Sequence, residues 1–281
     1  MPSQEKRSTR PLRMVAAFAL VALAGCEGPI VARSVDARYR LAQAQLANGR
    51  FPTALSTLAR VQRDDMGGET GRRAQLLRLA VLSGVARGFQ DMGERYLQGH
   101  QQESAGPVAT ELRTVGMSYF SRARNYVVEL MGAVDLFVSK PPAEPWVMDW
   151  PRLGEVSKGR EALERIAAGV LVEEAERLEA EQARSWLGVA RALPVAAEGE
   201  GRDVEIEPAA FYLSLARELV RLSDIFGPRA LQERRSRRLC LERAAAAAER
   251  ARERAEDQGK VKWVEQSEAV LIRVRKLLET K

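Results

Sequence analysis

The sequence predicts an all-α fold, either an α-solenoid or an irregular bundle of antiparallel helix pairs. Ala, Leu, Arg and Glu are abundant and aromatic residues make up only 6% of the chain, a mixture that favours helices over strands. Apolar residues recur three or four positions apart along most of the chain, and no segment predicts a strand. With 281 residues, 46% of them hydrophobic, the chain can bury a substantial core and is too apolar to be disordered throughout.

The N-terminal segment has the order of charged and apolar residues that is typical of a secretory signal. A charged stretch ends at Arg13, an apolar run covers residues 14–23, and small residues precede Cys26. The apolar run is about half of the ~20 residues that a membrane-spanning helix needs. The four residues Leu23, Ala24, Gly25 and Cys26 resemble the lipobox of bacterial lipoproteins.

This resemblance implies that residues 1–25 are removed and that Cys26 carries covalent lipid on its sulfur and on its new amino group. Several acyl chains on one residue anchor a protein stably to a membrane, so residues 26–34 would form a tether. By analogy with that family, Glu27 after the cysteine is compatible with sorting to the outer membrane rather than the inner one, with the protein facing the periplasm. The alternative is a plain secreted protein in which Cys26 is a thiol that can pair with Cys240.

The folded part is predicted to begin near Val35 with two helices joined by a tight turn. Apolar residues at helical spacing lie on both sides of Asn48 and Gly49, and glycine is typical directly after a helix. This segment resembles a tetratricopeptide repeat, which is a pair of antiparallel helices. The residues that carry the resemblance are Leu41, Ala42, Ala44, Gly49, Phe51 and Ala54.

The small residues of this pattern have a structural reason. Ala42 and Ala54 lack bulk, so the two helix axes can approach closely, and the larger residues Leu41, Phe51 and Leu58 fill the flanks. A second, degenerate unit is predicted further along the chain. Its members are Leu79, Ala80, Phe89 and Tyr96, with Arg87 and Met92 at the turn and small positions.

Residues 35–139 form the predicted tetratricopeptide-like region, whose last helix begins at Pro107 and includes Tyr119 and Tyr126 in its apolar stripe. Segment 140–150 contains three prolines and must break that helix, since proline lacks the amide donor. It is predicted as a linker to a C-terminal helical region, residues 151–281. Trp146 and Trp150 are interpreted as an apolar cap that closes a helical layer, with an exposed recognition knob as the alternative.

The C-terminal region predicts one long amphipathic helix over residues 159–193, an acidic loop over residues 194–207 and three further helices. The first of these three helices is predicted to begin at Pro208, since proline suits the first turn of a helix, and its apolar stripe ends before Gly227. The next helix ends near Gln258, and the last carries apolar residues from Trp263 to Leu278. The acidic side chains of the long helix are interpreted as its solvated face: Glu173, Glu174, Glu176, Glu179 and Glu181.

The residue inventory offers little for catalysis or metal binding. His100 is the only histidine, so a multi-histidine metal site is impossible, and Cys240 between two leucines is typical of a buried apolar residue. The phosphate-binding glycine motifs are absent. We therefore predict no catalytic residue, no metal and no cofactor beyond the covalent lipid on Cys26.

The charge of the chain does not favour nucleic acid as a partner. Formal net charge is +6, and residues 1–25 hold four basic side chains against one acidic one, so the remainder is only weakly basic. An arginine cluster nevertheless opens a helix rich in Arg and Glu. It is interpreted as a surface with ion pairs between successive turns, with binding of anionic lipid head groups or glycan phosphate as the alternative. The cluster consists of Arg234, Arg235, Arg237 and Arg238.

Three functional hypotheses follow from these observations. The first is a non-enzymatic scaffold, anchored to a membrane through Cys26, that binds envelope proteins in the assembly of an envelope or outer-membrane machine. The second starts from Glu103 and Ser104, which are similar to the Glu-Ser pair of lytic transglycosylases; that resemblance would make Glu103 the catalytic acid of a peptidoglycan-cleaving enzyme. The third is a purely structural or oligomerising envelope protein.

Overall fold

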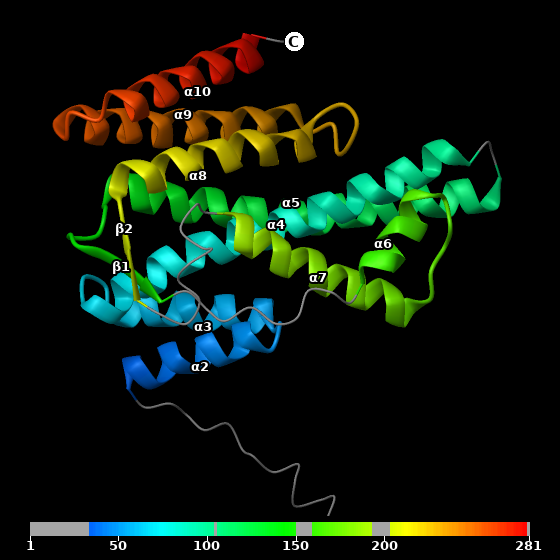
Figure 1. Cartoon of the computed structure of the whole chain (residues 1–281), viewed down its shortest axis with the longest axis horizontal. Coiled ribbons are helices and arrows are strands. Elements are labelled where there is room, and N and C mark those ends of the chain that lie inside the picture. The colour runs from blue at the N-terminus through cyan, green and yellow to red at the C-terminus, as the bar shows by residue number, and fades with distance from the viewer. Residues whose placement is uncertain (1–33, 104–105, 150–158, 193–202, 280–281) are drawn as a thin grey trace, which may run out of the picture. The chain divides into compact units, whose positions relative to one another are not determined.

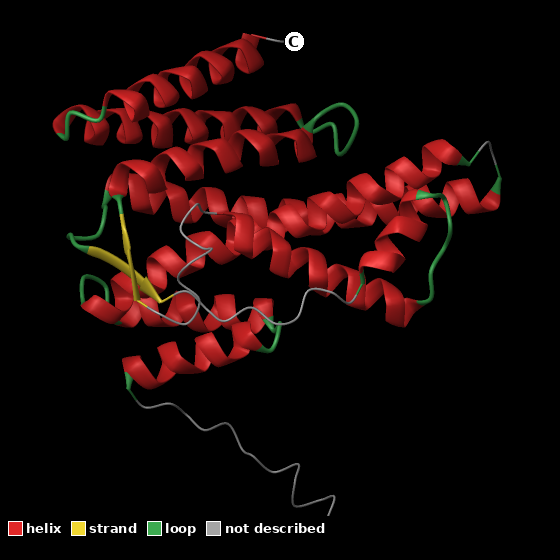
Figure 2. Cartoon of the chain, in the orientation of Figure 1, coloured by secondary structure: helices red, strands yellow, loops and turns green. Residues whose placement is uncertain are grey.

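The computed structural model describes residues 34–103, 106–149, 159–192 and 203–279 of the chain. These ranges belong to one compact unit, Ser34–Lys281. Within them the chain forms nine α-helices, one short 3-10 helix and one two-stranded sheet, which confirms the all-α prediction (Figure 1 and Figure 2). The predicted signal segment, with the lipobox that ends at Cys26, lies outside the described residues. None of the described helices is both long enough and apolar enough to span a bilayer.

The elements, in chain order, are α2 (Val35–Ala47), α3 (Phe51–Asp64), α4 (Glu69–Gln102), α5 (Pro107–Ser139), β1 (Trp146–Asp149), α6 (Arg160–Ala167), α7 (Glu174–Ala192), β2 (Asp203–Ile206), α8 (Pro208–Leu222), the 3-10 helix η1 (Ser223–Phe226), α9 (Arg234–Asp257) and α10 (Val261–Glu279).

Helices α2 and α3 confirm the predicted helix, tight turn and helix. The Ser34 hydroxyl accepts a hydrogen bond from the amide of Ala37 and caps the start of α2. At its end Gly49 adopts a φ of +69°, which glycine tolerates because it lacks a Cβ, and the amide of Arg50 donates to the carbonyl of Gln45. Pro52 then occupies the first turn of α3, where its missing donor costs nothing.

The predicted contact residues of this pair divide into two groups. Ala42, Ala54, Phe51 and Leu58 are buried, as close packing of the two helices requires. Leu41 is 42% exposed and Ala44 is also exposed, so neither fills the flank of the contact. The reason is the rotational position of α2, whose buried face consists of Tyr39, Ala42 and Leu46.

The predicted second unit, which starts at Leu79 and Ala80, is wrong. All six of its positions lie in the single helix α4, which continues through Arg87 without a turn. Helix α4 carries several glycines but no proline, and burial of most of its surface against α5, α7 and α3 outweighs the weak helix propensity of glycine.

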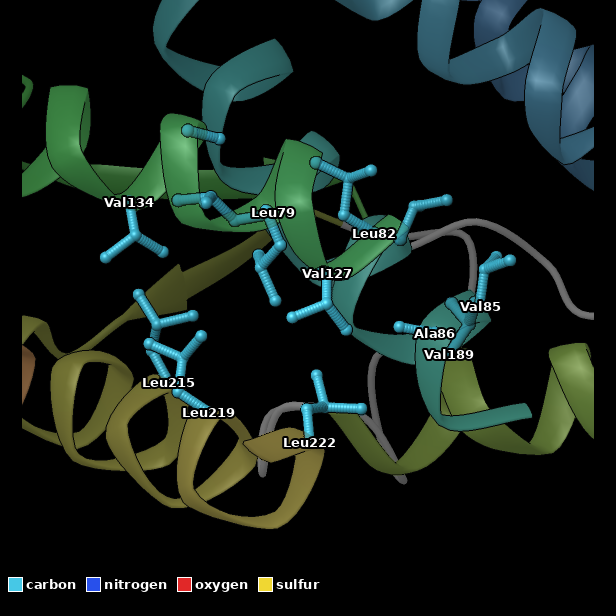
Figure 3. Packing of buried hydrophobic residues seen from close by; sticks show 14 of the residues in the cluster. Leu79, Leu82, Val85, Ala86, Val127, Val134, Val189, Leu215, Leu219 and Leu222 are labelled. Carbon is cyan, nitrogen blue, oxygen red and sulfur yellow. The ribbon is translucent and has the colours of Figure 1, made fainter. Parts of the chain in front are cut away.

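The centre of the fold is the antiparallel pair α4 and α5, which start at Glu69 and, as predicted, at Pro107. Figure 3 shows Leu79 and Leu82 of α4 near Val127 and Val134 of α5, with leucines of α8 closing the same apolar space. Helix α9 lies between α8 and α10 (Figure 1), and both of these helices contact it extensively. The hydrophobic cluster contains residues from both sides of segment 140–150.

The sheet is a second departure from the prediction, which contained no strand. Strands β1 and β2 pair antiparallel, with Trp146 opposite Ile206. Four-residue strands are too short for alternation to stand out from helical periodicity, and the two partners are far apart in the sequence. Trp146 is buried, and the centre of its ring lies 5.1 Å from the centre of the Phe137 ring, which confirms the cap interpretation for this tryptophan. Trp150 lies outside the described residues.

The predicted helix over residues 159–193 is two helices, α6 and α7. Gly169 ends α6 with a φ of +90°, its amide donates to the carbonyl of Ile166, and the amide of Val170 donates to that of Arg165. This hydrogen-bond pattern is the Schellman motif, which satisfies the last carbonyls of a helix and turns the chain away from its axis. The three further helices predicted after residue 207 are present as α8, α9 and α10.

Candidate binding site

Helices α4 and α7 meet without intervening side chains. A Cβ on Gly188 would overlap the carbonyl oxygen of Gly84, and one on Gly88 would lie 2.6 Å from the Cα of Ser185. The two backbones can approach this closely only because these positions in α4 and α7 are glycine. This crossing holds α7 close to α4, beside α5. It therefore fixes the distance between the walls that these helices give to a neighbouring cavity.

A cavity of about 290 Å³ opens where four parts of the chain converge. We call it the Phe89 pocket. Its walls come from the turn between α2 and α3 and from helices α4, α5 and α7. It is lined by Gly49, Phe51, Pro52, Val85, Phe89, Arg122, Tyr126, Leu178, Glu181, Gln182 and Ser185.

Its floor is part of a stack of four aromatic rings along the contact of α4 and α5. The centre of the Phe89 ring lies 5.5 Å from the centre of the Tyr126 ring, with 13° between the two planes. It lies 6.1 Å from the centre of the Tyr119 ring, with 27° between the planes. Tyr119 in turn stacks on Tyr96 at 5.5 Å. Stacked rings have few rotatable bonds and pack against each other, so this floor is rigid.

A charged pair closes one side of the Phe89 pocket. Arg122 donates two hydrogen bonds of 2.6 Å to the two carboxylate oxygens of Glu181, and its guanidinium carbon lies 4.2 Å from the centre of the Phe89 ring. The Tyr119 hydroxyl also donates to Glu181, at 3.3 Å. Burial and the neighbouring Glu181 carboxylate raise the pKa of Tyr119 above its usual range, so this hydroxyl stays a donor at neutral pH.

The Phe89 pocket offers both apolar and polar contacts. The pocket combines an apolar aromatic floor with Arg122, Glu181 and Gln182, which offer hydrogen-bond donors and acceptors at its edge. Leu178, which is 53% exposed, adds an apolar surface on α7 beside the opening. Protein interfaces commonly have an apolar centre surrounded by a polar rim.

The predicted site residues lie partly in this pocket. Gly49 and Phe51 line it, and the Phe51 ring meets Trp186 edge-on at 4.9 Å. Ala42, Ala54 and Leu58 lie in the helix contact behind it. The lipidation residue Cys26 lies outside the described residues, as does the rest of the lipobox, Leu23, Ala24 and Gly25.

Glu103 follows the last residue of α4 and is exposed. Nearby His100 is half-buried, with its Nδ1 2.9 Å from the carbonyl oxygen of Ala109.

Over the ranges described, no group of three or more His, Cys, Asp and Glu side chains is placed to hold a metal ion. Cys240 is fully buried and its thiol donates to the carbonyl of Leu219, in line with the prediction of a packed apolar residue.

The sequence pattern does not predict that Arg122 and Glu181 form part of this site. Glu181 is one of the acids interpreted as a solvated face, and this is wrong, because its side chain is only 16% exposed and Arg122 and Tyr119 bind it. Arg122 lies directly between residues of the predicted α5 stripe, so its position next to the aromatics was a usable signal. Its partner, however, is 59 residues away in the sequence.

A second polar cluster joins the sheet to the first helices. Arg73 of α4 donates to Asp149 of β1 at 2.8 Å, to Asp203 of β2 at 3.1 Å and to Glu69 at 2.7 Å. Gln43 of α2 also donates to Asp149, at 3.3 Å. Burial and the hydrogen bond with Asp203 raise the pKa of Asp149 to about 6. That hydrogen bond and the Arg73 guanidinium lower the pKa of Asp203.

No protein-family model matches the chain, and no curated protein shows significant similarity to it.

Proposed function

We propose that this protein is a membrane-anchored envelope lipoprotein that acts without catalysis, as a scaffold that binds another protein through the Phe89 pocket. The observation that carries the proposal is the convergence of four parts of the chain on one rigid aromatic floor with a charged rim. Binding sites of this composition contribute affinity through a few anchored side chains, surrounded by polar contacts that exclude water.

The occupant we propose is an extended segment of the partner that inserts one apolar or aromatic side chain. A cavity of about 290 Å³ is at the lower limit of the range for sites that enclose a whole small molecule, and it accommodates one large side chain. Gln182, Arg122 and Glu181 at the rim can then bond to the backbone amides and carbonyls on either side of that side chain.

The anchor is proposed from the lipobox resemblance of residues 23–26. Lipid on Cys26 would hold the scaffold at a membrane facing the periplasm, the outer membrane by the analogy of Glu27, and would raise its encounter rate with other envelope components. In this proposal the protein works by positioning its partner. It uses no cofactor apart from the covalent lipid, and it binds neither metal nor nucleic acid.

The proposal can be tested by photocrosslinking in intact cells, with p-benzoylphenylalanine in place of Leu178 at the pocket. A matched control places the same probe at Ile272, which is 52% exposed on α10 and distant in sequence from every pocket residue. We expect one protein to be captured at position 178 and not at position 272, and its capture to fall when Cys26→Ser removes the anchor.

Binding of the purified partner then decides whether the pocket is responsible. Leu178→Glu should weaken its affinity about tenfold or more, whereas Ile272→Glu should leave the affinity unchanged. The same proteins captured at both positions, or equal effects of the two glutamates, would contradict the proposal. So would release of peptidoglycan fragments by the purified protein that Glu103→Gln abolishes, since that result supports the enzyme hypothesis.

A further inference from the structure

A larger cavity, of about 480 Å³, lies at the opposite end of the sequence. We call it the arginine pocket. It is enclosed by the loop that follows η1, the first turns of α9 and the end of α10. Its lining residues are Phe226, Gly227, Pro228, Gln232, Arg234, Arg237, Arg238, Leu241, Leu277 and Leu278.

The apolar part of the arginine pocket is built from residues of three elements. Phe226 and Leu241 are buried, and Leu277 packs partly against the hydrophobic core. Leu278 is 40% exposed and extends the apolar surface outward. Surface of this kind gains free energy when a hydrocarbon chain removes it from water.

The loop on one side is fixed by its own hydrogen bonds. The amides of Ala230 and Gln232 both donate to the carbonyl of Gly227 at 3.1 Å, and the amide of Leu231 donates to that of Ile225 at 3.0 Å. Gln232 adopts a φ of +57°, a conformation that side-chain-bearing residues rarely take. The wall that Gln232 contributes is therefore preformed.

The other side of the pocket carries three arginines, Arg234, Arg237 and Arg238. Among the described residues neither Arg234 nor Arg237 forms an ion pair, and the Nε of Arg237 is enclosed without a hydrogen-bond acceptor. Arg238 is paired with Glu242 at 2.9 Å. An enclosed donor without an acceptor costs free energy, and an anion in the cavity would supply the missing acceptor.

The nearby acid and the helix end add to this preference for an anion. Glu233 does not neutralise the cluster, because its carboxylate accepts hydrogen bonds from Arg124 and Ser236. Helix α9 begins at Arg234 without a side-chain cap, and the first amides of a helix attract negative charge.

Further along α9, Arg243 and Arg254 pair with Asp135 and Glu144 of other segments, and two arginines pair within the helix as predicted. Arg250 pairs with Glu253 at 2.9 Å, and Arg252 lies 3.6 Å from Glu256. Within the described part of the chain, the arginines of α9 that form no ion pair are all at the end of the helix that borders the cavity: Arg234, Arg235 and Arg237.

We propose that the arginine pocket binds a small amphiphile with one hydrocarbon chain and one anionic head, a carboxylate or a phosphate. The chain would lie on Phe226, Leu241 and Leu277, and the head would accept hydrogen bonds from Arg234 and Arg237. A cavity of about 480 Å³ is within the range of ligand sites in proteins. An inorganic anion alone would leave the apolar part uncovered, and a neutral hydrocarbon would leave Arg237 without its acceptor.

The experiment is calorimetric titration of the full chain carrying Cys26→Ser, so that no lipid on that residue can occupy the cavity. The probes are octanoate, decanoate and decyl phosphate below their micelle concentrations, with inorganic phosphate as the head alone and decyltrimethylammonium as the chain with the opposite charge. We expect affinity to rise about fourfold for each added methylene until the cavity is filled. The two controls should bind at least tenfold more weakly than decyl phosphate.

Variants locate the site. Arg237→Gln and Arg234→Gln should each weaken decanoate binding about tenfold. Arg235→Gln, a change in the same cluster at a residue that does not line the cavity, should change it less than twofold. Leu278→Ser should reduce the gain per methylene, and thermal melts of every variant check that the fold survives.

Four results would overturn the proposal. They are equal weakening by Arg235→Gln and Arg237→Gln, decyltrimethylammonium binding as tight as that of decanoate, inorganic phosphate binding as tight as that of decyl phosphate, and binding to phosphatidylglycerol vesicles without any binding of the monomeric amphiphiles. The last of these results would assign the arginines to a bilayer surface instead of to a cavity.

Discussion

Gly84 and Gly188 lie in backbone contact where α4 crosses α7, and neither position has room for a Cβ. The contact determines how far α7 stands from α4 and α5, and therefore the size of the Phe89 pocket between them. It also explains why α4 keeps Gly84 and Gly88 in its interior, where each glycine costs about 1 kcal/mol relative to alanine.

Gly84→Val should therefore destabilise the protein strongly. Even the first carbon of the new side chain would lie 2.8 Å from the carbonyl carbon of Gly188, and this neighbour is backbone that cannot rotate away. We expect a loss of about 1–3 kcal/mol or more in the free energy of unfolding, measured by urea titration. The control is Gly132→Ala on the exposed side of α5, where nothing lies within 4 Å of a new Cβ and a gain of about 0.4–1 kcal/mol is expected. Equal effects of the two substitutions would show that the α4 and α7 backbones do not touch.

Ala54→Trp tests the contact of α2 and α3 in the same way. Ala54 is fully buried in that contact, so the largest side chain must force the helices apart, at a cost of about 1–3 kcal/mol or more. Ser56→Trp, at an exposed position of the same helix, should leave the melting temperature almost unchanged. If both variants melt like the wild type, the packing of α2 on α3 described above is wrong.

Helix ends show how far the sequence alone could go. Gly49 stands directly after an apolar stripe and marks the end of α2 correctly. Gly169 makes the same type of cap, yet Val170 and Leu171 follow it at helical spacing, so the periodicity continues across the break. A hydrophobic pattern cannot distinguish a helix that continues from a cap whose next residues pack elsewhere, and for this reason it predicts one helix where α6 and α7 are present.

Tertiary pairing explains why the candidate site was mostly missed. The stripe that includes Tyr119 and Tyr126 was predicted, because it follows from local periodicity. The local pattern places Phe89 in a degenerate repeat and Glu181 on a solvent-facing surface. Their roles depend on the glycine contact of α4 with α7, which joins segments about 100 residues apart. Gly84 and Gly88 share one face of α4, but their spacing does not identify the segment that packs against them.

The contact between Arg122 and Glu181 should be measurable by a double-mutant cycle. Both carboxylate oxygens are bound at 2.6 Å and the guanidinium lies over Phe89, so we expect a coupling free energy of about 1 kcal/mol between Arg122→Gln and Glu181→Gln. The comparison is Arg160 with Glu164, an exposed pair one turn apart on α6, for which the coupling should be about 0.3 kcal/mol or less. Coupling at Arg122 no larger than at Arg160 would mean that the charged rim of the Phe89 pocket is not formed.

Asp149 should make stability depend on pH in a defined window. Its pKa in the folded protein is about 6, above the ordinary value of 3.8, so between these two values the folded protein holds a proton that the unfolded chain releases. The contribution of Asp149 to the free energy of unfolding therefore decreases as the pH rises from about 4 to 6. Asp203 has the opposite sign, because its pKa is lowered, and its contribution is lost only as the pH falls below 3.8.

Asp149→Asn removes the titrating group while keeping its shape. We expect the free energy of unfolding of the wild type, minus that of this variant, to fall between pH 4 and pH 6 and to level off above it. Asp203→Asn should lower the pKa of Asp149, followed by carboxyl carbon NMR, because the hydrogen bond and the charge of Asp203 both raise it. Burial would keep that pKa above 3.8 in the variant, since burial is its largest cause. A difference that rises with pH over this window would show that the pKa of Asp149 is not raised in the folded protein. An Asp149 pKa that does not respond to Asp203→Asn would exclude the hydrogen bond between the two carboxyl groups across the sheet.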